Sequence, residues 1–181
     1  GKAQPHIRKE VYTWPKFTFK LKDVELNFNM QHNSPSQTLM LDVCDDSNPL
    51  SVYLGNPSLK SSYEYYCWLE WSGFRQERMR RWNLRLALRT IDNAIGQLRQ
   101  FNPQTGGYTY RPWNIDGNRG LTAAGSFGQS IDKKKRWYFN LGTDVKLDRS
   151  VDFANTDETA DFQKSIVHNL HVSPNASIAY H

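Results

Sequence analysis

The sequence predicts an all-β protein, built as an antiparallel meander of long strands. Apolar and polar residues alternate with a period of two along several segments, which is the pattern of a strand with two unlike faces. Clusters of Gly, Pro, Asn, Asp and Ser separate these segments, as turns require. No amphipathic segment has a convincing helical period. These observations predict one β domain over 1–181, with roughly eight to ten strands.

The first two strands are predicted near the start of the chain. Apolar and polar residues alternate over 17–21 and again over 24–31, and the phase changes at Lys22 and Asp23. This change predicts a tight turn or a bulge. Residues 32–60 are rich in turn-forming residues but also contain bulky apolar ones. We therefore expect a long ordered loop there rather than a linker.

The next strands are unusually long. Alternation is unbroken for nine residues over 63–71, nine over 82–90 and eleven over 137–147. Strands of globular proteins average about 5–6 residues, whereas membrane-barrel strands need about 9–11. The lengths therefore favour a barrel or part of a barrel wall.

The remaining segments complete the meander. Residues 91–101 fit either a strand or a short helix, and 107–113 read as extended chain. A strand is predicted over 121–127. Residues 149–161 are polar and acidic and predict a loop, and one or two strands should cover 163–181.

Composition excludes several classes of protein. Aromatic residues make up 13% of the 181, which argues against disorder, and no apolar run is long enough for a membrane-spanning helix. The net charge is +5, but the basic residues are spread over many segments. A charged hairpin turn is the favoured interpretation of Lys133 to Arg136, and we predict no nucleic-acid partner.

No chemical site is predicted. Glu64 and Glu70 are about 20 Å apart along one strand face, too far for a carboxylate pair acting on one bond. His168 and His171 should lie on opposite faces of a strand, and the acidic residues of 148–161 match no calcium-binding loop. Cys44 and Cys67 have no metal-site spacing. We therefore expect no catalysis, no cofactor and no metal.

Two stretches resemble the β-barrel region of TonB-dependent-receptor-like outer-membrane proteins. The first is "DDSNPLSVYLGNPSLKSSYEYY", 45–66, which leads into an outgoing strand. The second contains "NPQTG" and "RPWNIDGN", followed by a strand, a short "DKKKR" turn and a long strand. The resemblance covers most of 24–153, and its central motif residues are Pro49, Leu50, Leu54, Gly55, Asn56, Pro57, Leu59 and Lys60.

The resemblance implies an outer-membrane location, a polar lumen and an unknown small ligand. Members of this family commonly carry a plug domain ahead of the barrel, and many take energy from the TonB system. A complete receptor barrel has many more strands than 181 residues supply. The chain is therefore expected to be a segment of such a barrel, with any TonB contact made by other parts of the parent protein.

Three residues on the polar side of 82–90 are candidate lumen-facing residues: Asn83, Arg85 and Arg89. A water-filled lumen accommodates charged side chains that a dry core does not. The Leu-Gly-Asn-Pro element is expected to form a rigid structural corner, since Gly55 and Asn56 tolerate positive φ and Pro57 fixes φ. An isolated barrel slice would have two unpaired edges and should self-associate.

A second function class stays open from the residues alone. The chain could be a soluble β-barrel or sandwich that binds a ligand such as carbohydrate. The chain combines a high content of aromatic residues with a low mean hydropathy, which supports this alternative. The stacking candidates are Trp68, Trp113, Tyr108 and Tyr110.

Overall fold

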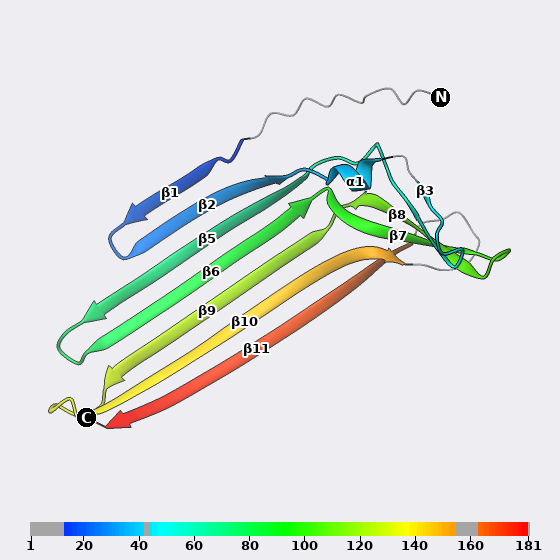
Figure 1. The fold of residues 1–181 in the computed structure, drawn as a ribbon. Coiled ribbons are helices and arrows are strands. Elements are labelled where there is room, and N and C mark those ends of the chain that lie inside the picture. The colour runs from blue at the N-terminus through cyan, green and yellow to red at the C-terminus, as the bar shows by residue number, and fades with distance from the viewer. Residues whose placement is uncertain (1–12, 42–43, 155–162, 181) are drawn as a thin grey trace.

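Seven antiparallel strands form one long sheet in the computed structural model, which describes residues 13–41, 44–154 and 163–180 (Figure 1). Within these residues the sheet is open, with β1 and β11 at its edges, and no closed barrel forms. The strands are, in spatial order, β1 (Lys16–Leu21), β2 (Val24–Asn33), β5 (Ser62–Arg75), β6 (Arg80–Asp92), β9 (Asn118–Ser130), β10 (Trp137–Ala154) and β11 (Gln163–Tyr180). The predicted all-β class and long antiparallel meander are thus confirmed.

A small mixed sheet is built from two insertions in the meander. The first, between β2 and β5, contains α1 (Gln37–Met40), β3 (Cys44–Asp45) and β4 (Ser51–Leu54). The second, between β6 and β9, is the hairpin of β7 (Ala94–Asn102) and β8 (Gly107–Ile115). Strand β4 pairs with β8 in parallel and so joins the two insertions. Within the described residues, no helix has the length and hydrophobicity to cross a membrane.

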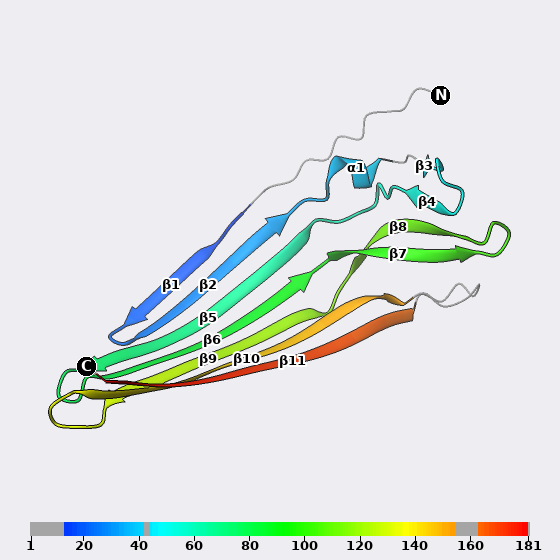
Figure 2. The ribbon, with the colours of Figure 1, turned by 60° about the horizontal axis from the view of Figure 1, so that its bottom comes forward.

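Both insertions leave the large sheet at the same end, which we call the insertion end. Figure 2 shows the small sheet there, and shows the turns β1–β2, β5–β6 and β9–β10 at the opposite, hairpin end. The β1–β2 turn consists of Lys22 and Asp23, as the phase change predicted. Lys22 adopts φ 49°, in the left-handed region.

The two faces of the large sheet differ sharply in polarity. Residues directly opposite one another in a sheet share a face. One row across all seven strands comprises Phe19, Leu26, Leu69, Leu86, Ala123, Val145 and Val172, and the next comprises Phe17, Phe28, Cys67, Leu88, Leu121, Leu147 and Leu170. We call this side the apolar face and the other side the polar face.

The apolar face is uncovered. Leu88 is 58% exposed and Leu170 65% exposed, near the middle and at one edge of the sheet respectively. Among the described residues the buried apolar side chains are few: Leu59, Ala87, Leu98, Ile115 and Val151, together with Pro35 and Pro112. Ile115 and Val151 lie where the β7–β8 hairpin leaves the large sheet, so this small core does not cover the apolar face.

One predicted loop needs correction, and the structure decides the segments that the sequence left open. Residues 149–154 were expected in a loop but continue β10, where Ser150 pairs with Val167 and Val151 with Ile166. Their polar and acidic composition hid the strand, and 155–161 lie outside the described residues. The ambiguous segment 91–101 is extended, with Asn93 at φ 52° between β6 and β7. The 32–60 segment contains α1, β3 and β4, and 163–180 is one strand.

Candidate functional site

The three candidate lumen-facing residues lie together on the polar face of β6. Each contacts the neighbouring strand β5. The Asn83 Nδ2 donates a hydrogen bond to Glu70 at 3.2 Å, and the Arg89 Nε lies 2.5 Å from the Glu64 carboxylate. The Arg85 guanidinium lies 3.5 Å from the Tyr66 hydroxyl and over the Trp68 ring. The structure thus brings the candidates together as one polar strip.

This strip continues on both sides along the polar face. Thr18 on β1 donates to Asn27 on β2, and Asn27 in turn donates to Glu25. On β10, Lys146 and Asp148 form an ion pair at 3.0 Å. Asn27 is itself buried, so its hydrogen bonds satisfy a polar group removed from solvent. The Lys146–Asp148 pair is exposed, and exposed ion pairs contribute only about 0–1 kcal/mol each.

The acidic and histidine residues considered in the sequence lie apart, with different partners. Glu64 pairs with Arg89, while Glu70 accepts from Asn83. His168 lies opposite Arg149 on the apolar-face side, whereas His171 lies opposite Lys146 on the polar side. Within the described ranges no group of His, Cys, Asp or Glu has the geometry of a metal site. Cys44 and Cys67 are both free thiols.

The Leu-Gly-Asn-Pro element forms a tight crossing of two chain segments. A Cβ on Gly55 would overlap the Leu41 carbonyl oxygen, so only glycine fits. Neither Gly55 nor Asn56 has a positive φ. The expected reason for these residues was therefore wrong: Gly55 is required by close approach of the backbone.

Asn56 fixes this crossing with its buried side chain. Its Nδ2 donates to the Pro112 carbonyl at 2.9 Å, and its Oδ1 accepts from the Ser58 backbone at 3.0 Å. The Asn56 backbone N–H donates to the Leu39 carbonyl at 2.7 Å. Asn56 therefore ties the first insertion both to itself and to β8.

The other motif residues also join the two insertions. The Leu50 carbonyl accepts a hydrogen bond from the Tyr108 backbone at 3.0 Å. Lys60 exchanges hydrogen bonds with the Asn114 side chain. Leu59 is buried, Leu54 pairs with Cys44, and Pro49 borders a small hollow beside β8. Pro57, at the corner itself, is exposed.

The four stacking candidates do not form one platform. Trp68 lies on the polar face of the large sheet, with its ring 5.0 Å from that of Tyr66. Tyr108 and Tyr110 lie on β8 of the small sheet, where Tyr53 stacks on Tyr110 at 4.9 Å. Trp113 is on the other side of β8 and packs against the Arg111 guanidinium.

Aromatic residues mark the hairpin end of the apolar face. The ring centroids of Trp71 and Trp82 are 6.1 Å apart. Trp137 and Tyr180 pair across β10 and β11 at 4.9 Å, and Phe127 and Phe139 lie 6.0 Å apart. We call these six residues, which span several neighbouring cross-strand rows, the aromatic row.

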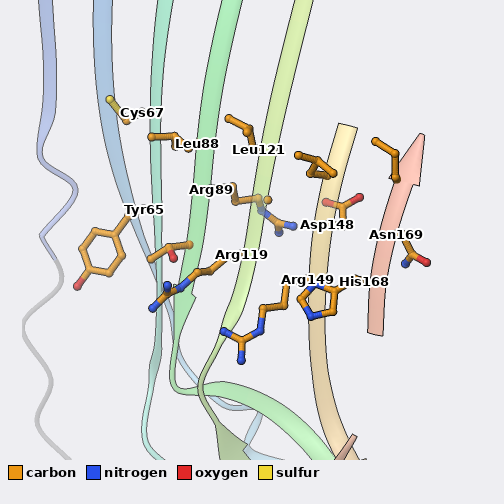
Figure 3. A pocket seen from close by; sticks show the side chains of 14 residues that line it. Tyr65, Cys67, Leu88, Arg89, Arg119, Leu121, Asp148, Arg149, His168 and Asn169 are labelled. Atoms are coloured by element: carbon orange, nitrogen blue, oxygen red, sulfur yellow. The ribbon is translucent and has the colours of Figure 1, made fainter. Parts of the chain in front are cut away.

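A hollow of about 610 Å³ lies toward the insertion end of the same sheet (Figure 3). Its apolar side is lined by Cys67, Leu88, Leu121, Leu147 and Leu170, and its polar side includes Arg119, Arg149 and His168. Each of these three directly continues the alternation beyond Leu121, Leu147 and Leu170. This phase relation is visible in the sequence, but the three residues stand singly at the ends of apolar segments and form no charged cluster along the chain, so the sequence analysis did not predict them.

Comparisons with protein-family models, with curated proteins and with solved structures gave no significant match for this chain.

Proposed function

We propose that this chain is a segment of the wall of an outer-membrane β-barrel, in a receptor- or transporter-like protein related to TonB-dependent receptors. The observation that carries the proposal is the apolar face. It runs without a break across all seven strands and is exposed. The opposite face of the same strands is polar, as in a wall between lipid and a water-filled lumen.

The energetic case concerns the large area of apolar surface. Burying one Leu or Phe side chain stabilises a protein by about 1.5–3 kcal/mol. Soluble monomers rarely expose apolar patches larger than a few hundred Å². The exposed apolar surface extends from one edge of the sheet to the other, as shown by Phe17, Leu88 and Leu170. Lipid would cover this surface without any further protein layer.

The dimensions of the apolar face agree with a bilayer. On β10, Trp137 in the aromatic row and Arg149 beside the hollow are twelve residues apart. At about 3.3 Å per residue this is about 40 Å along the strand. A strand tilted by about 40°, as in membrane barrels, would project this to about 30 Å, the thickness of the hydrocarbon core.

The two ends of the sheet support an orientation. Outer-membrane barrels have short periplasmic turns and longer extracellular loops. The hairpin end carries the short turns, so we place it toward the periplasm, and we place the insertion end outside. The small sheet and the polar strip of Asn83, Arg85 and Arg89 would then meet an incoming small ligand, and any TonB contact would belong to other parts of the parent protein.

The test uses single cysteines on neighbouring residues of β6, introduced into a chain in which Cys44 and Cys67 are replaced by Ser. Leu86→Cys and Leu88→Cys lie on the apolar face, and Arg85→Cys and Arg89→Cys on the polar face. Each variant is labelled with an environment-sensitive dye and reconstituted into vesicles. We expect brominated acyl chains to quench the two leucine positions and aqueous iodide to quench the two arginine positions.

The proposal requires that the type of quencher alternates between the leucine positions and the arginine positions. Quenching by iodide alone at all four positions would show a sheet in water and would contradict a barrel wall. Protection of Leu86→Cys and Leu88→Cys from both quenchers would mean that protein covers the apolar face.

A binding module of the soluble class has one observation in its favour, the aromatic cluster of the small sheet. Its four rings form a chain of contacts across β4, β8 and β7. The ring of Tyr53 contacts that of Tyr110, Tyr110 contacts Tyr108, and Tyr108 contacts Phe101. Calorimetric titration with neutral oligosaccharides tests this second candidate. Heat that disappears in Tyr53→Ala would support it, and no heat with the wild-type chain would remove it.

A further inference from the structure

We propose that the hollow between the leucine row and Arg119, Arg149 and His168 binds a phosphorylated membrane lipid. The lipid phosphate would lie on the two guanidinium groups, and an acyl chain would lie along Leu121, Leu147 and Leu170. This rests on the proposed function, because it requires the apolar face to contact lipid.

The first argument is that two arginines stand directly opposite one another in one row, with a histidine next to them. Arg119 on β9 lies directly opposite Arg149 on β10, and Arg149 lies directly opposite His168 on β11. Figure 3 shows these three side chains together below the leucines. Like charges placed directly opposite across strands are destabilising, so this arrangement calls for an anion.

The second argument is that the residues described by the structure supply no such anion. Within the parts of the chain that the structure describes, neither Arg119 nor Arg149 forms a side-chain hydrogen bond or ion pair. Several carboxylates lie near this end of the sheet, including Asp148, which lines the hollow, and Asp92, which is on the same face as Arg119. Among the described residues none of them forms an ion pair with Arg119 or Arg149. Asp148 pairs with Lys146 at 3.0 Å, and Glu64 pairs with Arg89.

The third argument is the position of the two arginines. The row of Arg119, Arg149 and His168 is immediately followed by the row of Leu121, Leu147 and Leu170 on the same side of the sheet. A soluble anion such as inorganic phosphate would gain nothing from the leucines. An amphiphile with an anionic head satisfies both halves of the hollow, because arginine forks match phosphate oxygens in two-point hydrogen bonds.

The experiment compares vesicles of phosphatidylcholine with vesicles in which about a quarter of the lipid is phosphatidylglycerol. The test variant is Arg119→Gln with Arg149→Gln. The matched control is Arg81→Gln with Arg85→Gln, which removes two cations from the polar face of the same sheet. Binding is measured by the fluorescence transfer from the protein to a dye-labelled phosphatidylglycerol, and insertion is measured separately by brominated-lipid quenching.

We expect the wild type and the control to prefer phosphatidylglycerol and the test variant to lose that preference. A basic residue at a membrane surface contributes about fivefold in binding to anionic lipid, so both arginines should contribute roughly 30-fold. Equal preference in the test variant and the control, with insertion intact, would overturn the lipid site and leave the barrel wall standing. Failure of the wild type to insert at all would overturn both proposals.

Discussion

Lys60 and Asn114 hold each other by two reciprocal hydrogen bonds across the junction of the two sheets. The Lys60 N–H donates to the Asn114 Oδ1 at 2.7 Å, and the Asn114 Nδ2 donates back to the Lys60 carbonyl at 2.9 Å. The same Nδ2 also donates to the Asn93 carbonyl. One side-chain amide therefore joins the start of β5, the end of β6 and β8.

Replacement of Asn114 should loosen this junction. Asn114→Ala removes three hydrogen bonds and leaves backbone groups without partners, at a cost of about 1–3 kcal/mol. The free energy of unfolding in urea, measured in detergent micelles, checks this. Asn102→Ala is the control, because Asn102 caps only its own turn through Gln104. Equal losses for the two variants would contradict the role of Asn114.

Gly55 should tolerate no side chain. In Gly55→Ala the methyl group would overlap the Leu41 carbonyl, and overpacking typically costs about 1–3 kcal/mol. Gly125→Ala is the control, since the nearest atom to its added Cβ is a Leu84 methyl at 3.8 Å. We expect a lower unfolding midpoint for Gly55→Ala alone. A midpoint matching that of the control would show that the Leu41 segment can move away at little cost.

The isolated chain should self-associate in plain buffer and not in mild detergent. The edges β1 and β11 present unpaired backbone groups, and Ile178 on β11 is 69% exposed. Size-exclusion chromatography with light scattering measures the mass in both solvents. A monodisperse 21.1 kDa monomer in buffer would count against an uncovered apolar face.

A pair of neighbouring substitutions sharpens this measurement. Ile178→Lys places a charge on the apolar face of the edge strand and should reduce the oligomer. Ser177→Lys places the same charge on the polar face, opposite Asn140, and should leave the oligomer unchanged. If Ser177→Lys is the more disruptive of the two, association does not use the apolar face.

Asp132 should make the β9–β10 turn sensitive to acid. Its Oδ1 accepts hydrogen bonds from the Trp137 N–H at 2.9 Å and the Arg136 N–H at 2.8 Å. These bonds, that from Trp137 foremost, lower the pKa of Asp132 below its ordinary value of 3.8. The carboxylate therefore stabilises the turn above pH 3.8, and this contribution is lost as the pH falls through the lower folded-state pKa.

Amide hydrogen exchange at Trp137 and Arg136 is the measurement for this turn. After correction for intrinsic exchange, protection should fall only below pH 3.8 in the wild type. In Asp132→Ala it should be low throughout. Protection that declines at higher pH, or equally in both proteins, would contradict a capping role for Asp132.

The long strands were predictable because alternation is a local property. Over 82–90 the polarity of each side chain indicates the face of the sheet on which it lies, and β6 follows that pattern. The extension of β10 through 149–154 was not predictable in the same way. Arg149 and Asp152 are polar at positions beyond the apolar rows, so composition there indicates a loop even though the strand continues.

In the candidate site, too, local features were predictable from the sequence and long-range contacts were not. Asn83, Arg85 and Arg89 could be grouped because all three lie on one strand. The partners of Asn56 and Asn114 could not, since Pro112 and Lys60 are distant in the chain. The reason for Gly55 was likewise out of reach, because it depends on the passage of Leu41 and not on any local conformation.

The parallel pairing of β4 with β8 has a consequence for how the chain reaches its native state. The β7–β8 hairpin closes by pairing residues that are near in sequence, such as Asn102 and Gly107. The pairing of β4 with β8 instead joins Ser51 to Tyr108, which are far apart in sequence. Closing a long loop carries a larger entropic cost than closing a hairpin, and distant pairings slow folding. The small sheet should therefore assemble in two kinetic steps, with the first insertion docking late on a hairpin that has already formed.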